Sequence, residues 1–217
     1  MAVAESIVHR GSSAHYDRFF AQFGPALTGA RESEAPLSMA LFDIDLFGQL
    51  NERHTRSGGD AIIGWLGKTL AESLGEKAEV VRYGGDAFAA ILRSVEKEEA
   101  FLLAESARRS LAGEHIVYSG DQAVKFPLTV SAGLASYPDD GVSCVDVVRK
   151  ANEALYRAKA GGRNKVCLAR EERMVTKTSH YTQGQLAGLA RLAKRMGVGE
   201  AVLLREALDD VLRKYNA

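Results

Sequence analysis

A short glycine-containing turn between two apolar runs is the feature that most restricts the fold of this 217-residue chain. The stretch Ala78–Leu92 reads AEVVRYGGDAFAAIL, with Gly84, Gly85 and Asp86 between the runs. Paired glycines favour tight turns because they accept backbone conformations that other residues avoid. The stretch therefore predicts a β-hairpin that carries an acidic residue at its tip.

The other segments place this hairpin in an α/β fold. The run LSMALFDID, residues 37–45, is apolar until its acids, which indicates a strand buried on both faces. Helices are expected over about 15–30, where GPALTG ends the helix, over 59–74, within 94–113 and over 143–160, with further strands over 126–138 and 164–169. The order β-α-β-β-α-β, followed by a further helix and strand, predicts a ferredoxin-like palm with a central antiparallel sheet. In such a palm Asp43 and Asp86 are neighbours in space.

Composition sets limits on the partners of the chain. It is 46% hydrophobic and 26% charged, with a formal net charge of zero, so no global charge attracts it to nucleic acid or membrane. The N-terminal residues lack the apolar core of a signal peptide, and no stretch approaches the ~18 apolar residues that span a bilayer. Cys144 and Cys167 have no metal-ligand spacing. We therefore expect a cytoplasmic protein with no membrane partner.

The two acids Asp43 and Asp86 would form a site of hard oxygen ligands. Mg²⁺ prefers one or two carboxylates together with the phosphates of a nucleotide, and paired ions of this kind assist nucleotidyl transfer. An acid after a strand is also commonly a solvated strand end. From the spacing alone, both interpretations stay open.

Four motifs follow one another in order: FDIDLFGQLN with GGD at 58–60, RYGGDAF, LTVSAGLASYP and ANEALYRAKAGGRNKV. Over residues 37–168 they resemble the GGDEF domain of the diguanylate cyclase family. The resemblance implies a site for GTP or a related purine nucleotide with Mg²⁺ or Mn²⁺. The implied metal ligands are Asp43, the carbonyl of Ile44 and Asp86, and the implied nucleotide contacts are Leu46, Phe47, Asn51, Asp60, Gly84, Gly85, Lys159 and Arg163. Asp45 is expected to be a structural hydrogen-bond partner instead.

Several positions depart from the family pattern. Ala87 stands where active members carry a catalytic acid, so no catalytic residue is assigned. Gly48 replaces a basic residue, Thr55-Arg56 replace Gly-His, and the N-terminal motif is represented, if at all, by ESIVHRGSS. The product-feedback motif would fall on Gly75 and Ala78 and is absent. The resemblance therefore implies a domain that binds nucleotide without efficiently condensing it.

The C-terminal segment resembles the ribbon-helix-helix family over residues 175–215. Val175–Thr182 predicts a short strand, and apolar residues at helical spacing predict two helices separated at Gly197. Units of this size bury little apolar surface alone, so a homodimer with paired strands is expected. Such strands enter the major groove of DNA. The residues implied to face DNA are Lys177, Ser179, Tyr181, Gly199 and Glu200.

The charge of this segment gives modest support to DNA binding. From Arg170 onward nine basic and six acidic residues leave a surplus of +3. A clasp that only dimerises or docks a partner is the alternative.

Three parts are thus predicted: a GGDEF-like nucleotide-binding domain at 1–168, a linker at 169–175 and a small dimeric ribbon-helix-helix module at 176–217. The leading hypothesis is a regulatory protein in which an inactive cyclase domain is coupled to a DNA-binding tail. An active or slow diguanylate cyclase, which makes cyclic di-GMP from two GTP molecules, is the first alternative. A protein-interaction scaffold is the second.

Overall fold

The computed structural model describes residues 14–170 except residue 55, and residues 178–215 except 197–198. The chain divides into two compact units, of which the larger contains residues 14–170 and the smaller contains residues 178–215. The predicted linker falls largely outside the described residues, and ESIVHRGSS lies wholly outside them.

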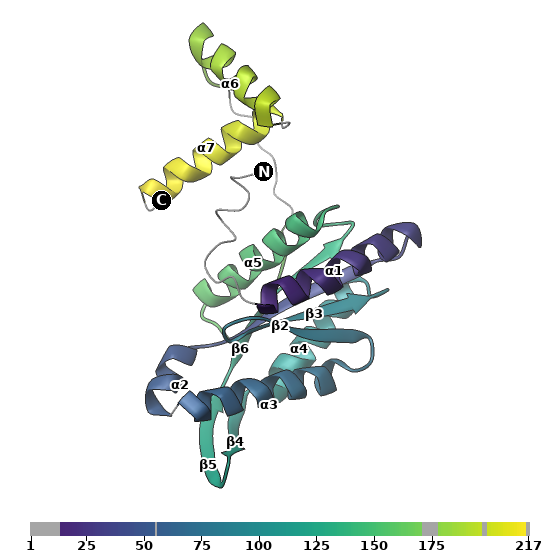
Figure 1. Cartoon of the computed structure of the whole chain (residues 1–217), viewed down its shortest axis with the longest axis vertical. Coiled ribbons are helices and arrows are strands. Elements are labelled where there is room, and N and C mark those ends of the chain that lie inside the picture. Colours follow the sequence, from purple (N-terminus) through teal and green to yellow (C-terminus); the bar gives the residue numbers. More distant parts are fainter. Residues whose placement is uncertain (1–13, 55, 171–177, 197–198, 216–217) are drawn as a thin grey trace. The chain divides into compact units, whose positions relative to one another are not determined.

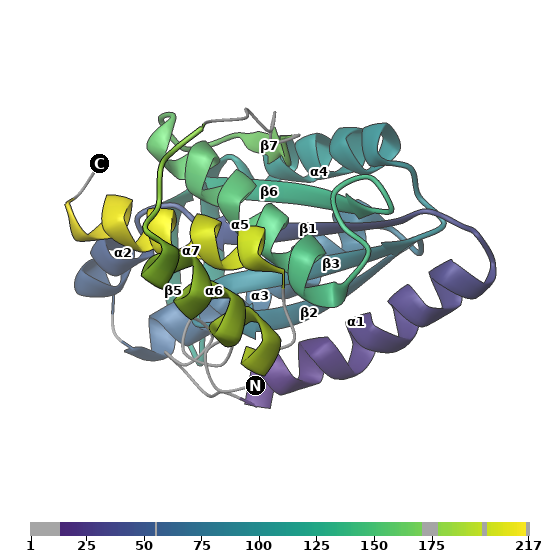
Figure 2. The ribbon, with the colours of Figure 1, turned by 90° about the horizontal axis from the view of Figure 1, so that it is seen from above.

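Five strands form the main sheet in the order β2-β3-β1-β6-β7 (Figure 2). Their bounds are β1 Leu37–Ile44, β2 Ala78–Gly84, β3 Ala87–Arg93, β6 Val130–Tyr137 and β7 Val166–Leu168. The central strand β1 pairs antiparallel with β3 on one side and β6 on the other, and only β7 adds a parallel pair. The predicted palm with a central antiparallel sheet is confirmed.

Helices cover both faces of this sheet (Figure 1). On one face pack α1 Ala14–Glu32 and α5 Cys144–Ala160, and on the other α2 Phe47–Arg53, α3 Arg56–Leu74 and α4 Lys97–Leu111. Side chains of a strand alternate between faces. Accordingly Leu37, Met39 and Leu41 join the core under α1 and α5, whereas Ala40, Phe42 and Ile44 join the opposite core. As predicted, β1 is buried on both faces.

Sequence reasoning missed a two-stranded hairpin. Strands β4 Gly113–Ser119 and β5 Gln122–Leu128 form a small separate sheet. The single strand predicted over 126–138 is therefore wrong, because residues 126–128 end β5 and Thr129 separates them from β6. Gly120, with φ 60°, lies in the tight turn beside Asp121. This Gly-Asp pair between two extended segments was the available signal.

The predicted end of the first helix at GPALTG is also wrong. Pro25 lies inside α1, which continues to Glu32. A proline within a helix costs about 3 kcal/mol. Phe19, Phe23 and Leu27 are nevertheless only 0–3% exposed against the sheet. Each such side chain contributes about 1.5–3 kcal/mol when buried, so packing outweighs the local penalty.

The smaller unit contains the two predicted helices, α6 Gln183–Met196 and α7 Glu200–Lys214. Residues 178–182 of the predicted strand form no strand, and 175–177 lie outside the described residues. Within the described residues of one chain, no strand pairs with the backbone groups of this segment. Thr182 instead begins α6 in a capping box. Its hydroxyl accepts the Gln185 amide at 3.2 Å, and the Gln185 side chain accepts the Thr182 amide at 2.9 Å.

Within the described residues, every helix is too short or too polar to span a lipid bilayer.

Candidate functional site

The topology of the sheet brings two of the predicted metal ligands together. Asp43 is the penultimate residue of β1, and its register partner on β3 is Ala87. Asp86 immediately precedes Ala87 at the tip of the β2–β3 hairpin. Partial burial, followed by the nearby negative charge of Asp43, raises the pKa of Asp86. The two carboxylates therefore belong to one site, as the predicted strand order requires.

Lys159, near the end of α5, provides a positive charge at this acid pair. Its Nζ lies 2.5 Å from Oδ1 of Asp43, whose side chain is only 16% exposed. The same ammonium group and Arg82 favour the ionised form of Asp86, yet the pKa of Asp86 stays above its usual value. Burial is the largest cause of this raised pKa, and the charge of Asp43 is the second.

The donor set fits a hard divalent cation. Two carboxylates and the Ile44 carbonyl at the end of β1 supply only oxygen, the element that Mg²⁺ and Mn²⁺ prefer. No cluster of three or more His, Cys, Asp or Glu suited to a metal occurs in the described part of the chain. An ion at Asp43 and Asp86 would therefore need phosphate or water oxygens as well, which is the usual Mg²⁺ arrangement.

The hairpin tip is fixed from within. Gly85, with φ 53°, and Asp86 form the turn, whereas Gly84 ends β2 after a register shift that follows Arg82. The left-handed backbone at Gly85 is accessible to glycine at little cost. The Arg82 guanidinium donates two hydrogen bonds to the Gly85 carbonyl, at 3.0 Å from Nε and 2.6 Å from Nη2. These bonds hold Asp86 at the end of β1.

A groove of about 410 Å³ lies between α3 and the β2–β3 hairpin. Its lining residues are Asp60, Ile63, Gly64, Gly67, Lys68, Val80, Arg82 and Phe88. Asp60, a predicted guanine contact, therefore shares this groove with the arginine that holds the hairpin tip. Asn51, the other predicted guanine contact, packs on the backbone of Gly59, where a Cβ would lie 2.2 Å from the Asn51 Oδ1. Gly59 thus allows Asn51 to approach α3 closely.

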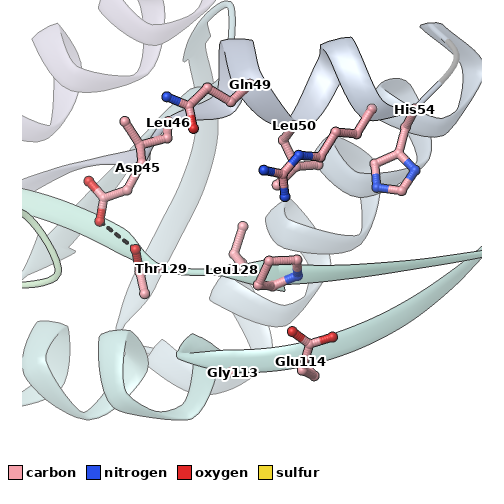
Figure 3. A pocket seen from close by; sticks show the side chains of 11 residues that line it. Asp45, Leu46, Gln49, Leu50, His54, Gly113, Glu114, Leu128 and Thr129 are labelled. Carbon is pink, nitrogen blue, oxygen red and sulfur yellow. Dashed lines mark hydrogen bonds between the residues drawn. The ribbon is translucent and has the colours of Figure 1, made fainter.

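Asp45 is a buried hydrogen-bond acceptor, in agreement with the structural role expected for it. The residue is 7% exposed and its carboxylate accepts three hydrogen bonds. The donors are the Thr129 hydroxyl at 2.8 Å (Figure 3), the Ser131 hydroxyl at 2.7 Å and the Asn164 amide at 2.9 Å. Asp45 therefore joins the end of β1 to β6 and to the turn after α5.

The remaining predicted phosphate contacts lie around this end of the sheet. Leu46, with φ 57°, turns the chain from β1 into α2, so the amides of Leu46 and Phe47 stand at the start of that helix. Arg163, also left-handed at φ 62°, is exposed in the turn after α5. Lys159 contacts Asp43 of the acid pair directly. Arg163 lies four residues after Lys159 in the chain. Their roles toward a nucleotide stay predictions.

A second hollow, of about 370 Å³, lies between α2 and the β4–β5 hairpin (Figure 3). It is lined by Asp45, Leu46, Gln49, Leu50, Arg53, His54, Gly113, Glu114, Pro127, Leu128 and Thr129. Sequence reasoning missed it because one wall belongs to the hairpin that was not predicted. Gln49 lines it from α2, His54 from the position just after that helix, and Glu114 from β4.

The structure describes four of the five residues predicted to face DNA. Ser179 and Tyr181 are exposed ahead of α6, and Gly199 and Glu200 are exposed at the start of α7. Lys177 lies outside the described residues.

Comparison with known protein families identifies the family to which this chain belongs. The family described as "Diguanylate cyclase, GGDEF domain" matches residues 17–165. The chain belongs to the GGDEF family. Residues 177–216 match a second family, described as "Ribbon-helix-helix domain". Both predicted resemblances are confirmed.

Relatives and solved structures agree with the GGDEF assignment. Diguanylate cyclase A of Treponema denticola is 31% identical over 66% of this chain and 38% of its own length. The GGDEF domain of YfiN from Pseudomonas aeruginosa has a TM-score of 0.67 at 25% identity, covering 74% of this chain and 99% of that one. The active GGEEF domain of a Vibrio cholerae diguanylate cyclase has a TM-score of 0.64 at 29% identity, covering 73% and 98%. The chain thus spans about two fifths (38%) of the Treponema relative and nearly all of the two solved domains.

Proposed function

We propose that this GGDEF domain binds GTP or a related purine nucleotide with Mg²⁺ and condenses it inefficiently or not at all. The observation that carries the proposal is the convergence of Asp43, Asp86 and Lys159 beside Ala87, whose methyl group can neither accept a proton nor bind a metal. Loss of a positioned acid or base typically lowers a rate by about 10²–10⁴. Binding and turnover are therefore separated in this site.

Each part of the site has a task in nucleotide binding. Asp43, Asp86 and the Ile44 carbonyl would hold the ion, which when bound neutralises triphosphate charge. Lys159 and Arg163 would contact the phosphates, and the amides after β1 would add hydrogen bonds. In the groove beside the hairpin, the Asp60 carboxylate would accept hydrogen bonds from a guanine edge.

Replacing Asp43 with asparagine tests this proposal. The change keeps the shape of the side chain but removes the charge that faces Lys159. Because hydrogen bonds and contacts to charged groups are worth about 1.5–3 kcal/mol, we expect GTP affinity in Mg²⁺ to fall about 10- to 100-fold. Isothermal titration calorimetry measures it, and Asp139→Asn, at an exposed acid away from the site, is the control. If the wild-type protein gives no heat and no thermal shift with GTP, the proposal is contradicted and only the scaffold hypothesis remains.

The rival function is an active or slow diguanylate cyclase. It is supported by the likeness to the active GGEEF domain of Vibrio cholerae. Incubation of the wild-type protein with Mg²⁺ and GTP, followed by chromatography, separates the two. Appreciable cyclic dinucleotide would contradict our proposal. We also propose that cyclic di-GMP does not occupy the feedback position, since Gly75 and Ala78 offer neither an arginine nor an aspartate.

For the smaller unit we propose a homodimer that binds DNA. Its support, beyond the family match, is the apolar surface that one chain leaves exposed. Leu204 is 37% exposed, Leu208 58%, Val211 51% and Tyr215 70%. A second copy that paired with the segment before α6 would cover such a surface and supply the missing strand partner. DNA affinity would then depend on nucleotide only if the nucleotide binds two states of the dimer unequally.

Leu208→Glu is expected to dissociate this dimer, because it places a charge on the apolar surface of α7. Sedimentation velocity should show a dimer for the wild type and a monomer for the variant. Leu102→Glu, at a leucine on α4 that is 67% exposed, is the matched control and should stay dimeric. Duplexes selected from a random library by the wild type should bind the control but not Leu208→Glu. A monomeric wild type would contradict the proposal.

A further inference from the structure

The turn between α5 and β7 has an unusual backbone. Arg163 and Asn164 are consecutive non-glycine residues with positive φ, at 62° and 44°. Such conformations are uncommon and persist where neighbouring groups fix them. The amide of Arg163 donates to the Ala158 carbonyl at 3.0 Å, which closes the end of α5. Both predicted phosphate-binding side chains, Lys159 and Arg163, belong to this part of the chain.

Asn164 is held at two points. Its backbone amide donates to Oδ2 of the buried Asp45 at 2.9 Å. Its side-chain oxygen accepts from Nη1 of Arg108, on α4, at 2.6 Å. The Arg108 side chain is only 12% exposed, and its Nε donates to Glu105 one helical turn earlier. The guanidinium therefore has a fixed direction before it reaches Asn164.

These contacts connect elements from both sides of the sheet. Helix α4 packs on the opposite face of the sheet from α5, and β7 is the edge strand of that sheet. Arg108 thus joins α4 to the turn that follows α5, while Asp45 joins the same turn to β1. Asp43, two residues before Asp45, is the acid that Lys159 contacts. The arrangement fixes the end of α5 relative to the acid pair.

We propose that Arg108 is a positioning residue for the phosphate-binding turn, which acts through Asn164 and sets the place of Arg163. This inference rests on the proposed nucleotide site. It assigns to α4, a helix outside that site, an effect on triphosphate affinity. Among the described residues, the Arg108 guanidinium donates to Glu105 and Asn164, so its effect on the nucleotide site passes through Asn164.

The experiment compares the binding of GTP with that of guanosine, using the 217-residue chain in the presence of Mg²⁺. Arg108→Met keeps an apolar stem and removes the donor. In Asn164→Gly, the glycine can adopt the positive φ and can still donate its backbone amide to Asp45. The side-chain oxygen that accepts from Arg108 is lost. We expect each to lower GTP affinity about tenfold, ~1.4 kcal/mol, with guanosine affinity unchanged. Arg109→Met, at the exposed neighbouring arginine, should change neither. Arg108→Lys should recover part of the loss, since one ammonium donor can still reach Asn164.

A purely structural role for Arg108 predicts a different result. General loosening of the fold in Arg108→Met would lower the affinities for GTP and for guanosine together. Asn164→Gly would then bind both ligands with the affinities of the wild type. Either pattern, or unchanged GTP affinity in both variants, would overturn the inference.

Amide hydrogen exchange separates this outcome from failure of the proposed function. Exchange over residues 161–165 should become faster in Arg108→Met and stay unchanged in Arg109→Met, with no nucleotide present. A wild type that binds no GTP would end both the proposed function and the phosphate-binding part of the inference. Unchanged exchange in Arg108→Met would overturn the positioning part alone.

Discussion

Ala87→Glu is expected to give diguanylate cyclase turnover about 10²- to 10⁴-fold above that of the wild type, the usual contribution of a positioned acid or base. Residue 87 is the register partner of Asp43 across β1 and β3 and follows Asp86 directly. A carboxylate introduced there joins the acid pair from the hairpin side. The family resemblance places the catalytic acid at this position. The variant therefore tests whether one missing group limits the reaction.

The same substitution has a cost without metal. A third carboxylate beside Asp43 and Asp86 adds like charge to a site that already raises the pKa of Asp86. We expect a lower melting temperature in the absence of Mg²⁺ and nucleotide, and a larger rise than in the wild type when both are added. Differential scanning fluorimetry at pH 7 measures these shifts, and chromatography of the products measures turnover.

Ala87→Gln is the matched control, because it adds nearly the same volume without charge. It should give no turnover and no additional stabilisation by Mg²⁺. Equal activity in the glutamine and glutamate variants would contradict a role for charge at residue 87. A glutamate variant that binds GTP but stays inactive would contradict the idea that this position limits the reaction. Gly48 or the Thr55-Arg56 pair would then carry the defect.

The main features of the site were predictable because they depend on strand order. Once the first strand and the hairpin are assigned, their antiparallel pairing places Asp43 beside Asp86, independently of the conformation of the loops. The salt bridge between Lys159 and Asp43 was not predictable in this way. Lys159 was expected at phosphate, and its distance from Asp43 depends on how closely α5 packs against β6.

The errors arose where tertiary packing outweighs local signals. The first helix continues through Pro25 because its aromatic face is buried under the sheet. The β4–β5 hairpin has alternating exposed and buried residues, but its turn, at Gly120, is the only strong local signal among its described residues. The contact of Arg108 with Asn164 joins residues 56 positions apart and needs the full fold to be seen.

Gly133→Ala is expected to destabilise the larger unit strongly. Gly133 lies on β6, where a Cβ would stand 2.1 Å from both the Ala151 carbonyl oxygen and the Leu155 amide nitrogen. These are backbone atoms of α5, so no side chain can rotate away and the helix itself must move. Overpacking usually costs about 1–3 kcal/mol, and we expect a value near the upper limit. For a protein of this size that lowers the melting temperature by about 6–12 °C.

Gly29→Ala is the matched control, since Gly29 lies in α1 with no atom within 4 Å of its Cβ position. Alanine is favoured over glycine in a helix by about 0.5–1 kcal/mol, so this variant should melt slightly higher than the wild type. The two glycines then respond in opposite directions to the same added methyl group. Because α5 carries Lys159, the Gly133 variant should also lose affinity for GTP at temperatures where it remains folded. An unchanged melting temperature for Gly133→Ala would contradict the close packing of α5 on β6 by which Lys159 reaches Asp43.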